Sequence, residues 1–405
     1  MTEVINTQCC IAGGGPAGMM LGVLLARAGV DVVVLEKHAD FLRDFRGDTV
    51  HPSTLEIIYE LGWLEDFLKC PHQKVNHMEG VIGKENITLA DFSHLKTQAP
   101  YIAFMPQWDF LNFLKQKAST YKNFTLIMQA KVDELLVAND TIVGVKATTD
   151  DGVIEVRSSL VVAADGRNSD VRRLAHMDVL EHGSPIDVLW FRISRKLDDP
   201  SAVFGRIMPG SLMVMLNRGD YWQCGYVIKK GEYEALKSQG LESFRKKILE
   251  NAPSLKESIH EIMDWEQIKL LTVKVDFLKK WYKDGLLCIG DAAHAMSPVG
   301  GVGINLAIQD AVAAANILAC PLAADKLNAV HVAAVQERRQ WPTKIIQFMQ
   351  LIMHKRIIYQ ALQSKKDFKA PLFLRAIAAM PVLQQLMGQF IGMGFRPEHI
   401  NICNK

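Results

Sequence analysis

The sequence predicts an α/β fold in which a Rossmann-like dinucleotide-binding domain carries an inserted antiparallel-sheet domain and is followed by C-terminal helices. Three observations support this fold class. Strand and helix patterns alternate through the first part of the chain, a glycine-rich turn follows the first apolar strand, and long alternating strands fill the middle. We therefore assign residues 1–181 (with small β insertions) and 276–320 to the nucleotide-binding domain, 182–275 to the insert and 321–405 to a helical region.

The composition is that of an ordinary globular protein. The chain has 405 residues, of which 49% are hydrophobic, and its net charge is +2. This length allows two cores with a cleft between them, and the charge gives no reason to expect a nucleic-acid partner. We expect no signal peptide, because the N-terminus lacks a basic segment followed by a long apolar one. The seven scattered cysteines show no metal-ligand spacing and suit a cytoplasmic protein.

The expected elements of the nucleotide-binding domain follow from hydrophobic periodicity. Ser53 and Glu56 have the spacing of a capping box, which places a helix start at Ser53, and Gly29 ends the first helix. Helices are expected at residues 16–28, from 53 and at 107–119, and strands at 8–12, 31–36, within 124–156, at 160–164 and at 286–289.

The insert and the C-terminal region have different patterns. Residues 182–275 contain alternating strands and a helix near 241–250, whereas a helix over 303–319 is followed almost entirely by further helices. The apolar stretch 372–395 is interrupted by Arg375, Pro381 and several glutamines, so we do not expect it to span a membrane. A buried helical cap is the main interpretation, and a membrane-surface face is the alternative.

The turn GGGPAG has the features of a dinucleotide-binding site. Gly13 permits the tight turn, Gly15 lets a pyrophosphate approach the backbone, and Gly18 lets the helix pack closely on the sheet. The helix that begins with Pro16 and Ala17 then presents free N–H groups to the phosphates.

An acidic residue closes the next strand, as this motif requires. Glu36 stands where a carboxylate can accept hydrogen bonds from ribose hydroxyls, and Lys37 follows it in the predicted site. Because a carboxylate repels a 2′-phosphate, this site favours FAD or NAD over NADP.

Two further motifs occur later in the chain. The stretch DGRNSDVRR carries Asp165, Gly166, Ser169 and Arg172, and GDAAHAMSPVGGVGIN is a second glycine-rich loop that leads into an apolar helix. Together with the first turn, these motifs make the sequence resemble the flavoprotein aromatic hydroxylases. These are the single-component FAD monooxygenases typified by para-hydroxybenzoate hydroxylase, and the resemblance covers nearly the whole chain.

The resemblance implies roles for the later loop. Asp291, after Gly290, would contact the ribityl and pyrophosphate part of FAD. The loop and helix start would face the pyrimidine end of the flavin, where a helix N-terminus stabilises the negative charge of the reduced ring. The residues implied here are Pro298, Gly301, Val302, Gly303, Ile304 and Asn305.

Four other positions match the family less specifically. Arg46 would lie near the FAD diphosphate or be a solvated loop cation, and Gln107 would reach the ribityl chain or only begin a helix. Val132 would meet adenine through its backbone. Asp165 would tie the FAD site to NAD(P)H use, with an exposed turn aspartate as the alternative.

The resemblance also implies an activity. NAD(P)H would reduce FAD, and O2 would then hydroxylate an electron-rich aromatic substrate, phenolic or polyketide- or quinone-like, through a flavin hydroperoxide. His51 and His294 lie in cofactor loops and are weak candidates for proton transfer, so no catalytic base is identified. The substrate bed is expected in the insert, where the candidates, each of which could instead be core, are Trp190, Met213, Met215, Trp222 and Tyr226.

Several alternatives stay open at this point. A reductase or dehydrogenase of the same fold would not insert oxygen, whereas a halogenase is disfavoured because no WxWxIP-like element occurs. A hydroxylase of quinone precursors would work at a membrane. A non-catalytic binding protein of this fold is a further alternative, although Gly15, Glu36 and Asp291 are intact. The chain would act as a monomer or a homodimer.

Overall fold

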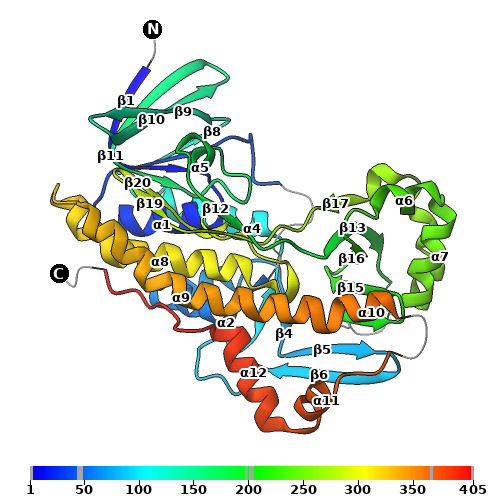
Figure 1. Cartoon of the computed structure of the whole chain (residues 1–405). Helices are drawn as coiled ribbons and strands as arrows, with labels where there is room; N and C mark the ends of the chain where they lie inside the picture. The colour runs from blue at the N-terminus through cyan, green and yellow to red at the C-terminus, as the bar shows by residue number, and fades with distance from the viewer. Residues whose placement is uncertain (1–2, 43–48, 197–198, 200–204, 365–367, 403–405) are drawn as a thin grey trace.

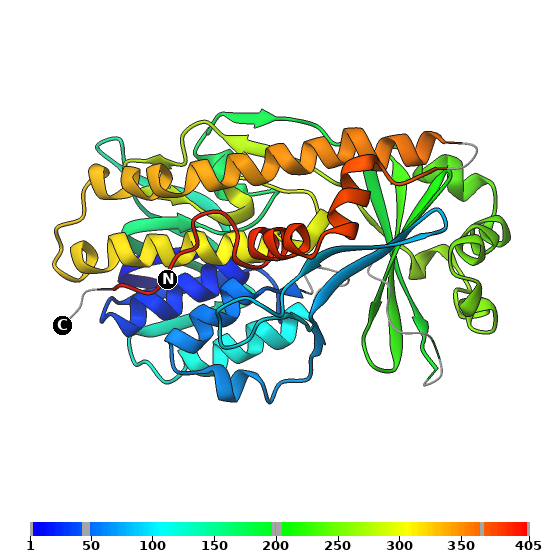
Figure 2. The same ribbon diagram turned by 90° about the horizontal axis from the view of Figure 1, so that it is seen from below.

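The computed structural model describes residues 3–42, 49–196, 199, 205–364 and 368–402. Two large sheets lie side by side, and the long helix α9 (Ala329–Met353) runs past both of them (Figures 1 and 2). One sheet belongs to the nucleotide-binding domain and the other to the insert. The predicted α/β fold class with an inserted antiparallel sheet is confirmed.

The first sheet has eight strands in the described part of the chain. Its central strands are parallel, and the run β2 (Val32–Glu36) is buried at every residue, as expected for a strand covered on both faces. The path along the sheet is β19 (Tyr282–Lys283), β20 (Leu286–Cys288), β11 (Gly152–Ala163), β1 (Glu3–Ala12), β2 and β8 (Phe124–Met128), and β10 (Thr141–Thr149) and β9 (Lys131–Ala138) extend it from β11.

Helices pack on this sheet where the sequence predicts them. Helix α1 (Pro16–Arg27) begins with proline at a position where no backbone donor is needed, and Gly29 follows its end with φ +86°. It packs against α8 (Gly303–Ala323) and α4 (Gln107–Ala118). The segment Val299–Ala323 is long and apolar enough to cross a bilayer, but 72% of its most apolar window is buried inside the protein.

The second sheet is larger than the predicted insert. Residues 182–275 supply β13 to β17, but the hairpin of β5 and β6 comes from within the first predicted domain and pairs with β14 in parallel. At the junction β12 (Val179–Glu181) pairs with β18 (Asp276–Leu278). The strand order is β17 (Lys269–Leu271), β13 (Ile186–Ser194), β16 (Tyr221–Lys229), β15 (Ser211–Asn217), β14 (Gly205–Met208), β5 (His77–Ile82) and β6 (Glu85–Asp91).

Smaller elements complete the two units. Helices α6 (Tyr233–Ser238) and α7 (Leu241–Asn251) cover the outer face of the insert sheet (Figure 1). The other small elements are β3 (Thr49–Val50), β4 (Gln73–Val75), β7 (Ile102–Phe104), α2 (Pro52–Glu60), α3 (Leu64–Phe67) and α5 (Asp170–Leu174).

The predicted capping box at the start of α2 is wrong. The helix begins at Pro52, its N-cap residue is His51, and no side chain caps it. Ser53 is buried instead of capping the helix. The proline sets the helix start because its ring already holds helical φ and its missing N–H needs no partner there.

The C-terminal region is helical, as predicted. Helix α9 continues through a π-helical turn (His354–Ile358) into α10 (Tyr359–Gln363). Helices α11 (Leu372–Ala379) and α12 (Pro381–Met393) follow, and the chain bends by 102° between them. Both pack on β6.

Candidate cofactor and substrate site

A cleft of about 680 Å³ runs between the two sheets. One end lies at the carboxyl ends of β1 and β2, where ligands bind in open α/β sheets. The other end is the inner face of the insert sheet. Both the first glycine turn and the second glycine-rich loop (residues 290–305, here called the late loop) line this cleft.

The first glycine turn forms one wall of the cleft. Gly13 has φ +107°, and a side chain there would meet the Ala164 carbonyl oxygen at 2.4 Å, whereas one on Gly18 would meet the Gly13 oxygen at 1.9 Å. Gly15 is different, because its nearest neighbour would be 4.0 Å away. Gly13, Gly15, Pro16 and Ala17 line the cleft, and Gly18 serves the packing of α1 on the sheet.

The carboxylate of Glu36 lies beside this turn. It is buried, with 8% of the residue exposed, and accepts hydrogen bonds from the backbone N–H groups of Gly14 at 2.9 Å and His38 at 3.1 Å. Lys37, Gln107 and Val132 also line this end of the cleft. Arg46 lies outside the described residues.

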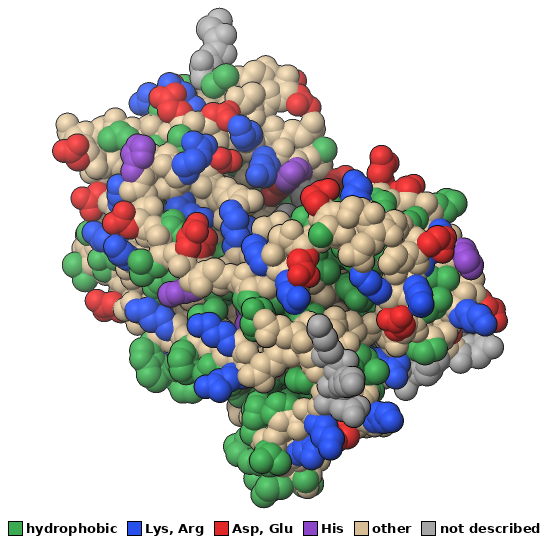
Figure 3. All heavy atoms as spheres, turned by 45° about the vertical axis from the view of Figure 1, so that its right-hand side comes forward, with side chains coloured by type: hydrophobic (Ala, Val, Ile, Leu, Met, Phe, Trp, Pro, Cys, Tyr) green, Lys and Arg blue, Asp and Glu red, His purple; other side chains and the backbone are tan. Residues whose placement is uncertain are grey.

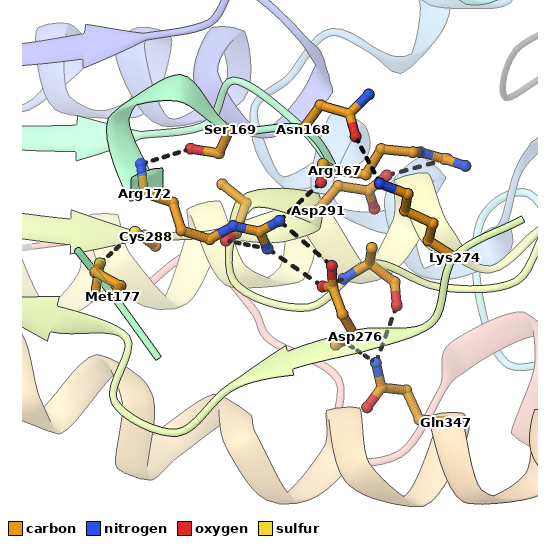
Figure 4. Close-up of polar contacts among 12 residues, drawn as sticks. Arg167, Asn168, Ser169, Arg172, Met177, Lys274, Asp276, Cys288, Asp291 and Gln347 are labelled. Carbon is orange, nitrogen blue, oxygen red and sulfur yellow. Dashed lines mark hydrogen bonds and ion pairs between the residues drawn. The ribbon is translucent and has the colours of Figure 1, made fainter. Parts of the chain in front are cut away.

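The DG motif brings a second charged group into the cleft (Figure 4). An Arg167 nitrogen lies 3.2 Å from a carboxylate oxygen of Asp291, and both residues line the cleft. One oxygen of Asp165 accepts from the backbone of Val171 at 3.1 Å, and burial raises the pKa of this carboxyl. The other Asp165 oxygen and one Arg167 nitrogen are buried without a partner among the described residues.

The serine and arginine of the same motif hold the loop in place. The Ser169 hydroxyl caps α5 by accepting from the backbone N–H of Arg172 at 2.9 Å. The Arg172 guanidinium donates to the carboxylate of Asp276 at 3.3 Å and to the carbonyl oxygens of Ala292 and Arg167 (Figure 4). These bonds connect the loop that carries Asp165 to the start of the late loop at Ala292. Ser169 and Arg172 therefore hold the wall of the cleft in position.

The late loop meets the first turn directly. Gly290 has φ +58°, and a side chain there would lie 3.0 Å from Ala307 and 3.3 Å from Ala17. Gly290 thus allows α8 and α1 to pack closely and does not line the cleft. Its N–H donates to the buried carboxylate of Asp310 at 3.1 Å. The next residue, Asp291, turns into the cleft.

In the later part of the loop, some residues line the cleft and others point away from it. Pro298, Gly301, Gly303 and Ile304 line the cleft, and a side chain on Gly303 would meet nothing within 4 Å. The side chains of the other two predicted residues lie elsewhere: Val302 lines a separate small pocket and Asn305 is buried.

The Asn305 side chain joins three segments of the structure. Its oxygen accepts from the backbone N–H of His51 and from the Thr54 hydroxyl, both at 2.8 Å, and its nitrogen donates to the Thr49 carbonyl at 3.2 Å. Asn305 therefore fixes the start of α2 against α8, and its side chain does not line the cleft.

The insert sheet supplies an apolar bed, but through the face opposite to most of the predicted residues. Trp190 lines the cleft and lies against Gly225, where a side chain would meet its ring at 3.0 Å. The residues that line the cleft from β13, β15 and β16 are Ile186, Val188, Trp190, Leu212, Val214, Leu216, Gly225 and Val227.

The other four predicted substrate residues lie in the core behind this bed. Met213, Met215, Trp222 and Tyr226 pack in a cluster with Phe244 of α7, and the Tyr226 and Phe244 rings are 5.4 Å apart. Successive side chains of a strand point to opposite faces, so the prediction selected the wrong face of β15 and β16.

Neither predicted histidine lines the cleft. His294 is buried with its Nε2 atom 2.6 Å from Asp310, which also pairs with Arg339 at 3.0 Å. His51 is buried, its Nδ1 atom is 2.9 Å from the Ile391 carbonyl oxygen, and burial lowers its pKa to about 4. Both side chains are therefore buried with partners inside the protein, which indicates a structural role for His51 and His294.

A different histidine stands behind the cleft. The Ser297 hydroxyl, from the late loop, shares a hydrogen bond of 2.7 Å with Nε2 of His354 in the π-helical turn. Ser297 lines the cleft, and so do Met353, Ile357 and Ile358 around the histidine. Burial lowers the pKa of His354 to about 4, so its ring is neutral at pH 7. Only the folded chain brings Ser297 and His354 together, 57 residues apart in sequence.

The residues present fit an FAD molecule. Backbone at Gly15 and Gly303 is open to the cleft at two separate points, so a long ligand can approach the chain closely at both. Polar atoms of Asp165, Arg167 and the Trp190 indole are buried without partners among the described residues. Such atoms are costly unless a ligand or water satisfies them.

Comparisons with known proteins agree with this fit. The FAD binding domain family matches residues 6–349. The 6-methylpretetramide 4-monooxygenase of Streptomyces rimosus is 30% identical over 84% of this chain and 81% of its own. The para-nitrophenol 4-monooxygenase of a Pseudomonas species is 24% identical over 74% of this chain and 75% of its own.

Solved structures show the same fold. A p-nitrophenol 4-monooxygenase from Pseudomonas putida superposes with a TM-score of 0.76 at 18% identity, covering 98% of this chain and 100% of its own. The anhydrotetracycline hydroxylase OxyS of Streptomyces rimosus gives 0.75 at 22% identity, over 97% and 77%.

The fold and the cleft define a flavin-dependent oxidoreductase. The chain belongs to the FAD binding domain family, and within it to the single-component FAD-dependent aromatic monooxygenases of the para-hydroxybenzoate hydroxylase-like type. It is an enzyme that uses FAD and NAD(P)H. The sequence relatives favour hydroxylation over a reductase or a non-catalytic binding protein.

Proposed function

We propose that this enzyme hydroxylates a large, neutral, polycyclic aromatic substrate of the polyketide type, and that the cleft residues named above hold its FAD. In the balanced reaction one oxygen atom of O2 enters the aromatic C–H bond as a hydroxyl, the other leaves as water, and NAD(P)H supplies the two electrons. FAD, when bound, supplies the redox chemistry and the activation of O2.

The chain's own residues orient the cofactor from both ends. The α1 N-terminus at Gly15 and Pro16 receives the diphosphate, because free N–H groups and the helix dipole favour an anion there. The carboxylate of Glu36 accepts from the ribose of the adenosine half. Asp291, held by Arg167 at 3.2 Å, accepts from the ribityl hydroxyls.

The other end of the cofactor meets the start of α8. The backbone at Gly303 is open to the cleft and stands at the N-terminus of a 21-residue helix. Its unpaired N–H groups and dipole favour negative charge on the reduced ring. This arrangement lets the protein stabilise that charge without a cationic side chain.

The apolar bed carries the proposal on the substrate. Among the described residues that line the insert side of the cleft, none is a lysine or arginine, and Glu79 alone is charged. A substrate carboxylate would lose its hydration there without gaining a cation. A flat aromatic ring system instead buries its surface against side chains such as Val214, Leu216 and Trp190.

The sequence relatives support the same substrate class. The Streptomyces rimosus enzyme named above, at 30% identity, carries the name of a 4-monooxygenase of 6-methylpretetramide. A second relative, 26% identical, is a 12-dehydrotetracycline 5-monooxygenase and anhydrotetracycline 6-monooxygenase.

A binding titration tests the substrate class. FAD-loaded protein would be titrated with a neutral tetracyclic phenol and with para-hydroxybenzoate while the flavin absorbance is followed. We expect the tetracyclic phenol to bind at least about tenfold more tightly, the equivalent of burying one or two ring edges. Tighter binding of the carboxylated single ring would overturn this assignment.

A further inference from the structure

The C-terminal helices concentrate exposed apolar side chains. Among the described residues, nineteen large hydrophobic residues are exposed, and ten of them lie between Trp341 and Phe395. Monomeric soluble proteins rarely leave so many together without a partner. We call this surface the C-terminal face, and its apolar members are Trp341, Phe348, Ile352, Tyr359, Leu372, Phe373, Met380, Val382, Leu386 and Phe395.

The bent helix pair at the centre of this face is two-sided. The inner side of α11 packs Leu374 against Ile82 and Ile87, which line the cleft. On its outer side Leu372 is 82% exposed. Helix α12 packs so closely on β6 that a side chain on Gly388 would meet the Asp91 carbonyl oxygen at 1.8 Å, while its Leu386 is 61% exposed. The outer sides therefore have no partner within the described chain.

The same stretch is strongly basic. Residues 341–395 contain seven lysines and arginines and a single acidic residue, Asp367, although the whole chain has a net charge of only +2. Lys355, Arg356 and Lys369 are exposed. Figure 3 shows hydrophobic and basic side chains next to one another on the lower part of the molecule.

We propose that the C-terminal face docks on an anionic lipid membrane surface. Exposed apolar side chains beside basic ones are what an interfacial helix needs, because the apolar groups enter the headgroup region and the cations meet acidic lipids. Helices of 8 and 13 residues that bend by 102° are too short and too sharply bent to span the bilayer. They lie in the interface.

The charge of the C-terminal face favours an anionic membrane over a second copy of the chain as its binding partner. A two-fold dimer through the C-terminal face would bring the same basic stretch of each copy together. Like charges facing each other oppose association, so this face is poorly suited to self-pairing. An acidic lipid surface is the complementary partner. This proposal does not depend on the identity of the aromatic substrate.

Vesicle co-sedimentation tests the docking surface directly. FAD-loaded protein of residues 1–405 would be mixed with phosphatidylcholine vesicles, with or without phosphatidylglycerol. We expect at least about tenfold more bound protein on the phosphatidylglycerol vesicles, falling as salt is added. The absence of sedimentation with phosphatidylglycerol vesicles at low salt would overturn the proposal.

Variants locate the contact. Leu372→Glu with Leu386→Glu should lower the bound fraction about tenfold, and Lys355→Glu with Arg356→Glu should do so by reversing two positive charges. Val330→Glu is the matched control, because Val330 is 75% exposed on α9 but outside the C-terminal face. Equal loss in the control would contradict the proposal. A dimer seen by light scattering that Leu386→Glu dissolves, without vesicle binding, would reassign the face to self-association.

Discussion

The hydroxyl of Ser297 and the Nε2 atom of His354 lie 2.7 Å apart, and they join the late glycine loop to the π-helical turn after α9. Ser297 lines the cleft between the late loop and the apolar bed, whereas His354 is buried behind it. A π-helical turn is uncommon and often marks a functional site. Ser297 directly precedes Pro298, which also lines the cleft.

We expect Ser297→Ala to weaken the binding of a phenolic substrate while FAD content stays unchanged. A neutral hydrogen bond contributes about 1 kcal/mol, so KM should rise about fivefold, and more NAD(P)H should be oxidised without product. Ser297→Thr keeps the hydroxyl and serves as the control. An Ala variant with unchanged KM and coupling would remove Ser297 from the substrate site.

Two buried histidines should make the protein sensitive to mild acid. His51 and His354 have pKa values lowered to about 4 from 6.5. The unfolded chain therefore takes up protons first as the pH falls below 6.5, and stability is lost between pH 6.5 and 4. At about pH 5 each histidine should cost about 2 kcal/mol of unfolding free energy relative to pH 7.5.

Urea unfolding at these two pH values measures this loss. His51→Gln combined with His354→Gln should reduce the difference between the two curves, even if it lowers both. A wild-type protein that is equally stable at both pH values would show that these side chains are not buried as neutral rings.

Two glycines of the first turn should respond differently to substitution. Gly15 has φ −73° and open space beyond its backbone, so Gly15→Val should leave the unfolding temperature of the FAD-free protein nearly unchanged but abolish FAD binding. Gly18→Val should destabilise the fold itself, because its side chain would overlap the Gly13 oxygen. Calorimetry and fluorescence titration with FAD separate the two effects. Retention of FAD by Gly15→Val would place the diphosphate elsewhere.

Adjacent residues of β15 test the face assigned to the substrate. Val214 lines the cleft, so Val214→Phe should exclude the larger substrates of a phenol panel with little change in stability. Met215 packs on the α7 side, so Met215→Phe should cost about 1–3 kcal/mol by overpacking and leave the substrate range unchanged. The reverse pattern, in a panel of binding constants and urea midpoints, would return the substrate to the face first predicted.

The sequence predicts the backbone conformation of the two glycine-rich loops well because backbone requirements are local. Gly13 has a positive φ in a tight turn, and Gly18 packs its helix against that turn, so both positions require glycine. The two residues lie within six positions of each other, so a short sequence motif is enough to identify them. The same holds for Gly301, whose φ is +64°. The direction of a side chain in a helix, such as that of Asn305, depends on distant neighbours and could not be predicted from the loop alone.

The substrate half is less predictable. The run Ser211–Asn217 is hydrophobic on both faces, because one face meets the α7 core and the other lines the cleft. Alternation therefore could not identify the cleft side, and the larger side chains Met213 and Met215 proved to be core. The β5–β6 hairpin joins the insert sheet across more than 100 residues of sequence, a pairing that no local pattern predicts.

The most direct test of the central claim follows the fate of oxygen. FAD-loaded protein, NAD(P)H and a neutral polycyclic phenol that perturbs the flavin spectrum would react under isotopically labelled O2, and the product would be weighed by mass spectrometry. We predict one labelled oxygen atom in the aromatic product and the other in water. Full oxidation of NAD(P)H with unlabelled phenol and all the label in hydrogen peroxide would contradict hydroxylation and make the chain a flavin-dependent oxidase.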